Sequence, residues 1–381
     1  MANIGIICEY NPFHNGHLYH INKIKEMFKD STLILVMSGN FTQRGIPSIL
    51  AKDEKTLIAK KYGVDLVVEL PFIYATESAD IFADAAVTIL NELKTDYIVF
   101  GSESNNIDNL INIANIQLND KDFDNKVKTY LNEGINYPTA ISKALKDKAD
   151  IVNTPNDLLA ISYIKSIIKN NYNIKPITIQ RTNDFHSKEL ENNIVSATAI
   201  REALDNNKDI SSYVPKEVSK LLKNRSNINY FPYLKYKIIT EGTDIKKYLT
   251  VDEGIENRIL KVIDSCNTLE DLIKKVKTKR YTYNKLSRMF IHILCSLTKE
   301  EVIKNKDVKY IRVLGFNEKG RKHLNKIKKD INLPVITNYS NSNGLLTIDN
   351  KINSILSLIM SKDKQHEYIK KEIKEVIRKI D

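Results

Sequence analysis

Short apolar runs alternate with segments of helical periodicity along the first part of the chain. The runs are four to six residues long and apolar on both faces, as in the strands of a buried parallel sheet. They fall at residues 4–8, 32–37, 66–70 and 97–100. Helical spacing predicts helices between and after them, at residues 17–28, 49–62 and 78–93. Strands that alternate with helices in this way form βαβ units, so the sequence predicts a Rossmann-like α/β fold on a parallel sheet.

The alternation of predicted strands and helices is less clear after residue 100, and it is lost beyond about residue 210. Before that point we expect helices at 122–133, 139–148, 156–169 and 196–206, and a strand at 177–181. After it we expect helices at 255–277, 284–298 and 362–380. Two strand-like runs, 308–314 and 334–336, suggest a small mixed element within the later part. We therefore predict a catalytic domain over residues 1–210 and a smaller, mainly helical domain over residues 211–381.

Charge divides the chain at the same place. Residues 211–381 carry 36 Lys and Arg against 20 Asp and Glu, a net charge of +16, whereas residues 1–210 carry −5. A Lys-rich proteome from a genome of low GC content would raise the Lys content everywhere, but it would not reverse the sign of the charge. We therefore expect the second domain to bind a polyanion and the first to hold a smaller ligand.

Composition excludes several classes of protein. With 42% hydrophobic residues, the chain can bury a core, which excludes a disordered or collagen-like protein. Cys8, Cys266 and Cys295 show no C-x-x-C spacing, so we expect a reduced, cytoplasmic compartment and neither a disulfide framework nor a zinc site. The N-terminus reads as a strand and not as a signal peptide, and no apolar run approaches the ~20 residues of a membrane span.

The segment from Glu9 to His17 directly follows the first predicted strand and opens the first predicted helix. Ligands of open α/β sheets bind beyond the carboxyl ends of strands, and a helix N-terminus offers its N–H groups to phosphate. Gly16 lets the backbone approach such a ligand. His14 and His17 can each donate a hydrogen bond to phosphate oxygens that gain charge in a transition state. The alternative interpretation is a pair of histidines with only structural partners.

A second motif occupies residues 194–201, a Ser- and Thr-containing turn that leads into a helix. Ser196 and Thr198 can bond phosphate, and Arg201 can reach the β- and γ-phosphates of a nucleotide. A plain helix N-cap beside a surface Arg is the alternative interpretation. Arg44 is a further candidate for a phosphate or an acetate group.

Five of the seven residues 274–280 are cationic, and two tyrosines follow them. Cations for phosphate beside aromatic rings for base stacking suit a single-stranded RNA loop such as an anticodon. The candidate contacts are Lys279, Arg280, Tyr281 and Tyr283. The alternative is a solvated helix end. A second basic cluster at residues 321–329 could extend this surface.

His-x-Gly-His in this position resembles the motif of the nucleotidyltransferase superfamily, which is related to class I aminoacyl-tRNA synthetases. More specifically, an ordered series of segments between residue 4 and about residue 288 resembles the bacterial tRNA(Met) cytidine acetate ligase family. These segments are residues 4–20, 37–45, 67–72, 100–103, 155–159 and 279–283. The resemblance implies acetylation of N4 of the wobble cytidine of elongator tRNA(Met). Acetate would be activated by ATP as acetyl-adenylate, with release of diphosphate and then AMP.

The resemblance also assigns residues to ATP binding. The ATP loop would comprise Ile7, Cys8, Glu9, Tyr10, Asn11, Pro12, Phe13, His14, Asn15, Gly16, His17, Leu18, Tyr19 and His20. Gly101, Asn156 and Arg181 would contact ATP as well. From the residues alone these three could equally be a strand-end turn, a helix cap and a surface Arg. We read Cys8 as a small packing residue beside the nucleotide and not as a nucleophile, because no base adjoins it in the sequence.

Two other functions compete with this interpretation. An adenylyltransferase for a small phosphorylated cofactor precursor would use the same loop, but it would not need a strongly basic domain. A nonenzymatic RNA-binding protein would need no intact His14, Gly16 and His17. We expect Mg²⁺ to accompany ATP, although the sequence shows no dedicated set of carboxylates for it. Acetate and elongator tRNA(Met) are the expected partners, with neither a membrane nor DNA among them.

Overall fold

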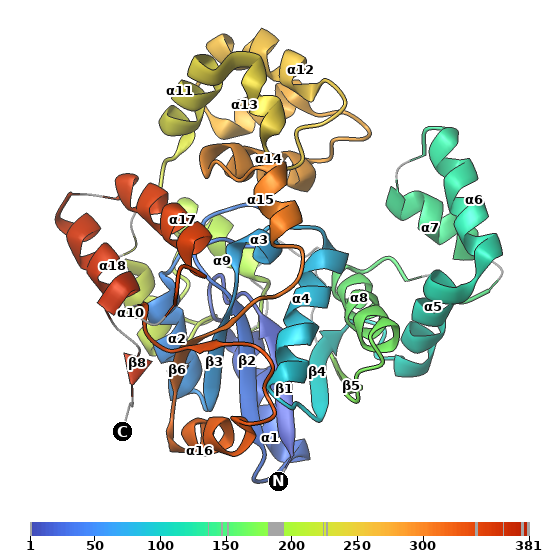
Figure 1. Cartoon of the computed structure of the whole chain (residues 1–381), viewed down its shortest axis with the longest axis vertical. Helices are drawn as coiled ribbons and strands as arrows, with labels where there is room; N and C mark the ends of the chain where they lie inside the picture. Colours follow the sequence, from blue (N-terminus) through green and yellow to red (C-terminus); the bar gives the residue numbers. More distant parts are fainter. Residues whose placement is uncertain are drawn as a thin grey trace.

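The computed structural model describes residues 2–135, 137–145, 148–150, 152–181, 194–223, 225, 228–339, 342–360, 362–374 and 377–378. A twisted, mainly parallel sheet crosses the middle of the molecule, and helices cover both of its faces (Figure 1). No helix in these described ranges is both long and apolar enough to span a lipid bilayer.

Five parallel strands form the first part of the sheet, in the order β5-β4-β1-β2-β3. Their bounds are β1 Asn3–Cys8, β2 Thr32–Ser38, β3 Leu66–Leu70, β4 Tyr97–Ser102 and β5 Lys175–Gln180. Each lies within two residues of the bounds expected from the apolar runs, so the predicted Rossmann-like parallel sheet is confirmed. All five residues of β3 are buried, which explains why four of them are apolar and why the fifth, Glu69, needs buried charged partners.

The helices divide between the two faces according to the alternation of side chains along β2. Ile34 and Val36 face one core, which includes residues of α4 Ala79–Glu92, α5 Ile107–Asn119 and α8 Pro155–Lys169. Leu33, Leu35 and Met37 face the other core. That core includes residues of α1 Asn15–Met27, α2 Lys52–Lys61, α9 Ala197–Asp205 and α10 Lys216–Lys223. Successive side chains of β2 thus point to opposite faces of the sheet, and because both sets are apolar, a layer of helices packs on each face.

The later part of the chain adds strands to the same sheet. Strand β6, Ile311–Phe316, runs antiparallel to β3, and both β7, Val335–Ile336, and β8, Ile377–Arg378, pair with β6. The expectation that the strand-like runs form a small element inside the second domain is therefore wrong. They complete the first sheet because β3 offers them an open edge. The division of the chain at residue 210 into two units remains a prediction.

A helical unit stands beyond the carboxyl ends of the parallel strands (Figure 1). It contains α11 Phe231–Glu241, η1 Gly242–Lys247, α12 Ile255–Val262, η2 Ile263–Ser265, α13 Leu269–Val276 and α14 Tyr283–Leu294. The single helix expected at 255–277 is divided, because Cys266 is extended and Thr268 caps α13 by accepting a hydrogen bond from the Asp271 N–H.

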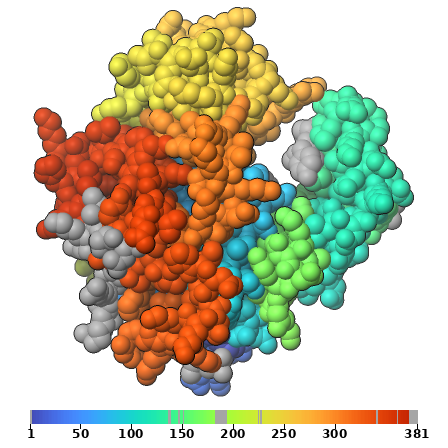
Figure 2. Space-filling model, in the orientation of Figure 1, coloured from blue at the N-terminus to red at the C-terminus, as the bar shows by residue number. Residues whose placement is uncertain are grey.

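Several further helices complete the molecule. They are α3 Phe72–Ala75, α6 Lys121–Asn132, α7 Tyr137–Leu145, α15 Lys299–Lys304, α16 Glu318–Ile327, α17 Thr347–Leu358 and α18 Lys362–Lys374. Helices α5, α6 and α7 form an arm that stands apart from the helical unit, and the space-filling view shows an open gap between the two (Figure 2).

Candidate active site

The predicted ATP loop lies where the strand order of the sheet reverses. Strands β2 and β3 extend to one side of β1, whereas β4 and β5 extend to the other. Successive crossovers leave β1 in opposite directions, so a crevice opens beyond its carboxyl end, which is the usual ligand site of such sheets. The loop after β1 and the first turn of α1 occupy this position.

His14 and His17 are held by the backbone of this first turn. His14 is the N-cap of α1, and its Nδ1 accepts a hydrogen bond of 3.0 Å from the Gly16 N–H. The His14 N–H donates over 3.2 Å to His17 Nδ1, which completes a capping box. The two imidazole rings stack with their centroids 3.8 Å apart. Both rings are therefore fixed side by side at the positive end of the helix.

Both imidazoles are neutral. Burial, together with the nearby Arg181 and Arg201, lowers the pKa of His14 to about 3. Burial and the adjacent His14 hold the pKa of His17 well below its ordinary value. A neutral imidazole that accepts a hydrogen bond at Nδ1 carries its proton on Nε2. Each ring therefore keeps one N–H donor for a ligand, without a positive charge of its own.

Several other residues of the ATP loop support its shape. Tyr10, Asn11 and Phe13 are buried, and Asn11 Oδ1 accepts a hydrogen bond of 2.7 Å from the Ile49 N–H. A Cβ at Gly16 would lie 2.9 Å from His14 Cε1, so a side chain there would displace the imidazole. The remaining members are buried Pro12 and the half-buried Ile7, Asn15, Leu18, Tyr19 and His20. The loop thus offers a ligand its backbone and its histidines more than its apolar side chains.

Cys8 fits the packing role that the sequence suggested. Burial and the adjacent Glu9 raise the pKa of its thiol to about 12. A thiol with this pKa holds its proton at neutral pH and is a poor nucleophile.

Glu103 brings the other three predicted ATP contacts together. Asn156 Nδ2 donates a hydrogen bond to Glu103 Oε1, and Arg181 Nε lies 3.6 Å from the same oxygen. Gly101 packs against Arg181, since a Cβ on Gly101 would lie 3.2 Å from Arg181 Cγ. The three residues are therefore neighbours at the carboxyl ends of β4 and β5, although they lie far apart in the sequence.

Two acidic residues of this region were not predicted as functional. Glu103 follows β4 directly, and Asp157 lies in the first turn of α8. Asp157 is fully buried and accepts hydrogen bonds from Ser102 Oγ, from the Ser104 N–H over 2.9 Å and from Thr154 Oγ1 over 2.7 Å. The available signal was their position, because a carboxylate at a strand end or in a helix's first turn often binds N–H groups.

The second motif forms a concentrated positive charge. Arg44 Nη1 and Arg201 Nη2 donate to the same hydroxyl oxygen, Thr198 Oγ1, over 3.2 and 3.1 Å. Arg201 also donates to the backbone oxygen of Asn11 over 2.5 Å, which joins this cluster to the ATP loop. Burial and the proximity of Arg44 lower the pKa of Arg201 to about 10. Two guanidinium groups around one hydroxyl suit a ligand with several negative charges.

Ser196 is a helix N-cap, which was the alternative interpretation of this motif. Its hydroxyl caps α9 by accepting a hydrogen bond of 3.1 Å from the Ala199 N–H. Thr198, which stands inside the helix, is the hydroxyl that contacts the arginines. The sequence therefore predicted the motif correctly as a helix start, whereas the division of roles between its two hydroxyls required the structure.

A buried Lys, not predicted from the sequence, joins the loops that follow β1 and β2. Lys55 is fully buried, and its Nζ donates to the backbone oxygens of Glu9, Ser38 and Gly39 over 3.0, 2.8 and 2.7 Å and to Ser48 Oγ over 3.0 Å. Burial lowers its pKa to about 7. Lys55 therefore fixes the start of the ATP loop relative to the loop that carries Arg44.

The predicted RNA-binding segment lies at the start of α14, close to this site. Ser287 Oγ on α14 donates over 2.9 Å to the backbone oxygen of Gly45, the neighbour of Arg44. Gly45 has a φ of +72°, and a Cβ there would lie 2.4 Å from the backbone nitrogen of Arg288. The helical unit therefore packs directly against the loop that carries Arg44.

The four candidate RNA contacts differ in exposure. Lys279 and Arg280 are exposed, and Arg280 forms an ion pair of 3.5 Å with Glu253. Tyr283 is 41% exposed and donates to Glu270 Oε2 over 2.7 Å. Tyr281 is only 3% exposed, and the Lys285 ammonium lies 4.0 Å from its ring centroid. The prediction that a base stacks on Tyr281 is therefore wrong. The ring is buried and covered by the Lys285 side chain, so Tyr281 has a structural role.

The second basic cluster lies at the opposite end of the strands from the ATP loop. It belongs to α16, whose N-cap residue Asn317 donates its N–H over 3.0 Å to the backbone oxygen of Asp65, just before β3 begins. The cluster is at the amino ends of the parallel strands, whereas the ATP loop and α14 lie at the carboxyl ends (Figure 1). The expectation that residues 321–329 extend the surface of α14 is therefore wrong.

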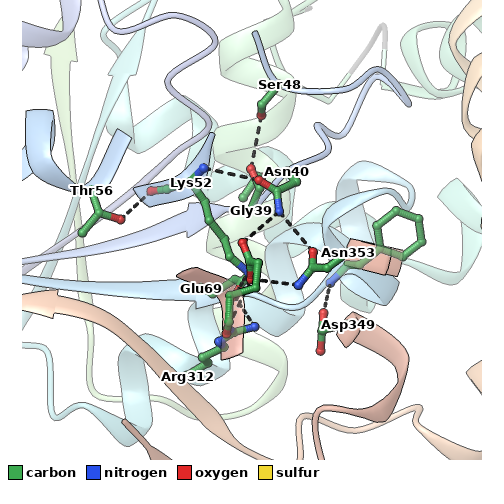
Figure 3. A network of polar contacts seen from close by, with 12 residues as sticks. Gly39, Asn40, Ser48, Lys52, Thr56, Glu69, Arg312, Asp349 and Asn353 are labelled. Carbon is green, nitrogen blue, oxygen red and sulfur yellow. Dashed lines mark hydrogen bonds and ion pairs between the residues drawn. The ribbon is translucent and has the colours of Figure 1, made fainter. Parts of the chain in front are cut away.

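A second polar centre, which we call the ion network, is buried beside β3 (Figure 3). Glu69 binds Lys52 Nζ over 3.0 Å and Arg312 Nη1 over 3.2 Å, and Glu372 of α18 binds the same cations over 2.6 and 3.4 Å. Burial raises the pKa of Glu69, but the two cations outweigh burial and the pKa is lowered. Asn353 Nδ2 adds a donor to Glu372 over 2.9 Å. Two cations thus face two carboxylates.

Metal ligands do not gather anywhere in the described part of the chain, where no group of three or more His, Cys, Asp or Glu side chains is arranged to hold an ion. Neutral N–H donors at a helix N-terminus, beside two guanidinium groups, can bind a polyphosphate and stabilise charge that develops on it.

Comparison with known proteins gives the same picture over the whole length of the chain. Residues 1–372 match the model of the family described as HIGH Nucleotidyl Transferase. A tRNA(Met) cytidine acetate ligase of Anoxybacillus flavithermus is 42% identical over 89% of each chain, and one of Clostridium tetani is 38% identical over 97% of this chain and 96% of its own. The crystal structure of Thermotoga maritima TmcAL bound with alpha-thio ATP covers all of both chains, with 30% identity and a TM-score of 0.89.

Proposed function

The chain belongs to the HIGH nucleotidyl transferase family and, within it, to the tRNA(Met) cytidine acetate ligases, and from this premise we propose that it joins acetate to a cytidine of elongator tRNA(Met) at the expense of ATP. The base would be the wobble cytidine and the acceptor atom its N4. We place the reaction in the cytoplasm, where ATP and tRNA meet.

One observation carries the proposal: the neutral pair His14 and His17 at the N-terminus of α1, at the reversal point of the sheet. In the first step an acetate oxygen attacks the α-phosphorus of ATP, and diphosphate leaves as acetyl-adenylate forms. Negative charge grows on the phosphoryl oxygens during this displacement. The Nε2–H groups of the two rings would donate to those oxygens, and their fixed positions require no reorganisation.

Other residues would hold the rest of the nucleotide. Arg44, Thr198 and Arg201 have the charge and the donors for the β- and γ-phosphates, and this role would extend to the departing diphosphate. Gly101, Asn156 and Arg181 would hold the nucleoside part and the α-phosphate from the side of β4. Ser196 would act through the backbone of α9. Mg²⁺ would arrive with the phosphates of ATP, since the described residues offer no separate site for it.

In the second step the cytidine N4 attacks the acetyl carbonyl carbon, and AMP leaves. The helical unit would position the tRNA for this attack, with Lys279 and Arg280 on phosphates and Tyr283 on a base. The contact between α14 and Gly45 supports this arrangement, because Gly45 is the neighbour of Arg44, which we propose binds the phosphates of ATP.

The test is incubation of the protein with labelled acetate, ATP and tRNA, followed by digestion and analysis of the nucleosides. We expect label in N4-acetylcytidine only when tRNA(Met) and ATP are both present. A variant tRNA(Met) with uridine at the wobble position is the matched control. Labelled adenylate transferred to a small phosphorylated acceptor would support the adenylyltransferase instead, and tRNA binding without any ATP turnover would support an RNA-binding protein.

A further inference from the structure

Acetyl transfer to a cytidine requires a proton acceptor, and the roles assigned above supply none. The lone pair of the N4 amine is delocalised into the pyrimidine ring, so this amine is a weak nucleophile and must lose a proton as it attacks. A positioned base contributes typically 10²- to 10⁴-fold to the rate of such a step. The inference below rests on the proposed function and concerns its second step alone.

The histidines of the loop are unsuited to this role. His14 Nδ1 accepts from the Gly16 N–H and His17 Nδ1 accepts from the His14 N–H, so the lone pair of each ring is already engaged. Their remaining nitrogens carry protons and act as donors. Lys55 is fully buried, and its Nζ is surrounded by four oxygen acceptors, so a substrate amine has no path to it.

Most carboxylates near the carboxyl ends of the strands are also engaged. Both oxygens of Asp157 accept hydrogen bonds. Glu103 accepts from Asn156 Nδ2 at one oxygen and from the Asp157 N–H over 3.2 Å at the other. Glu69 is held between Lys52 and Arg312 in the ion network. A proton acceptor needs an oxygen that substrate can reach, and these three groups do not offer one.

Glu9 differs from them. It directly follows β1 at the start of the ATP loop and is half-buried. Its Oε1 accepts a hydrogen bond of 2.6 Å from the Gln43 N–H, and its Oε2 has no hydrogen-bond partner among the residues that the structure describes. The Gln43 bond fixes the carboxylate and leaves the second oxygen for a ligand.

We propose that Glu9 is a catalytic residue of the second step and that its Oε2 accepts the proton of the cytidine N4 amine. As N4 attacks, a bond forms between nitrogen and the acetyl carbonyl carbon. The bond between that carbon and the phosphate oxygen breaks, and AMP leaves with the electron pair. The N4 proton passes to Glu9, which then releases it to solvent. No oxidant, reductant or further reactant is needed.

The surroundings of Glu9 set its basicity. Burial raises the pKa of its carboxyl above the ordinary value, which makes the carboxylate a stronger base. The Gln43 N–H, Lys55 of α2, Arg44 of the loop after β2 and Arg201 of α9 oppose this rise. The three cations act on Glu9 from the elements packed around the loop and favour its ionised form. The titratable groups of Cys8 on β1 and Tyr163 on α8 face it as well.

The experiment separates the two steps in Glu9→Gln, which retains an oxygen for the Gln43 N–H. Diphosphate release from ATP and acetate measures the first step, and single-turnover transfer from synthetic acetyl-adenylate to tRNA measures the second. We expect the second step to fall on the order of 10²- to 10⁴-fold. Because Glu9 belongs to the ATP loop, the first step can fall as well, but by far less than the second. Glu77→Gln is the matched control, because Glu77 is also a buried carboxyl with a raised pKa that accepts a backbone N–H.

A pH profile distinguishes a base from a merely structural group. Wild-type transfer should decline as pH falls through the pKa of Glu9, because only the ionised carboxylate accepts a proton. In Glu9→Gln the slow residual rate should lose this acidic limb. Wild-type transfer rates in Glu9→Gln, or an equal loss of both steps, would overturn the assignment. Failure of the proposed function would look different, since the wild-type protein would then show neither step.

Discussion

Two buried polar centres lie near the carboxyl ends of the central strands, and they use their charges in opposite ways. In the ion network each carboxylate lies against two cations. Figure 3 shows Glu69 between Lys52 and Arg312. In the ATP loop, His14 and His17 each keep an Nε2–H donor, and like charges are gathered at Arg44 and Arg201. A cluster in which every charge has a partner stabilises the fold. N–H donors without a partner and positive charges close together favour the binding of an anionic ligand instead.

The largest effect that should follow from this contrast is on stability. Arg312→Ala leaves Glu69 and Glu372 with only Lys52 between them, and breaking a buried ion pair in this way costs about 3–5 kcal/mol. Urea unfolding measures the loss. Diphosphate release per folded molecule should be unchanged. Lys304→Ala, which breaks an exposed pair with Glu300, is the control and should cost less than about 1 kcal/mol. Equal costs for the two variants would remove the basis of the comparison.

The second effect is on catalysis. His14→Ala and His17→Ala each remove a fixed donor, so adenylate formation should fall on the order of 10²- to 10³-fold, measured as diphosphate release. His14→Asn is the control for folding, because Asn is also a strong N-cap and should keep the stability of α1 while activity is lost. Near-wild-type rates in both Ala variants would show that these histidines are structural, like the ion network.

The third effect separates the helical unit from the ATP site. Charge reversal at Lys279 and Arg280 should weaken tRNA binding about tenfold and make its salt dependence shallower, since each phosphate contact contributes about 0.7 to 0.9 to the slope. Acetyl-adenylate formation should be nearly unchanged. Reversal at Arg321 and Lys322 of α16 is the matched control, because that helix lies at the amino ends of the strands. Equal losses from both pairs would indicate nonspecific attraction by the basic surface.

The smallest effect compares two histidines. Burial lowers the pKa of His292 to about 3, as for His14, but Thr76 and Thr250 bond both of its ring nitrogens. Between about pH 6.5 and 3 the unfolded chain binds a proton at His292 that the folded chain does not, so stability falls as pH falls. His292→Gln should make this dependence shallower by about 1 kcal/mol between pH 6 and 5. Urea unfolding at both pH values checks it, and diphosphate release at pH 7 should not change.

The sequence predicted local structure well because the strands of a parallel sheet are buried on both faces. The apolar residues at 4–6 and at 66–68 and 70 follow from that burial, and Glu69 is the buried exception. His-x-Gly-His was informative because its position between a strand and a helix is itself local. The same reasoning grouped Thr198 and Arg201 in one motif, and the structure brings them into contact because of their spacing along α9. Their role in phosphate binding stays a prediction.

Long-range pairing could not be predicted in this way. Glu69 and Arg312 are neighbours across β3 and β6, but no pattern near either residue indicates its partner. The run at 308–314 was recognised as a strand, yet an apolar period does not specify which edge a strand joins. The role of Tyr281 could not be predicted either. An aromatic residue beside lysines is compatible both with an exposed ring that stacks on a base and with a ring buried in the core.

The pairing of β6 with β3 has a consequence for biosynthesis. Translation is vectorial, so β3 leaves the ribosome long before Ile311–Phe316 is made. Until then the edge of β3 is open, and Lys52 and Glu69 have only each other as partners in the ion network. Exposed edges of this kind attract other strands, and chaperones commonly shield them in nascent chains. A chain released early would lack Arg312 and Glu372 and would keep both defects. The edge of β3 and its ion network are therefore completed only when synthesis has passed β6 and α18.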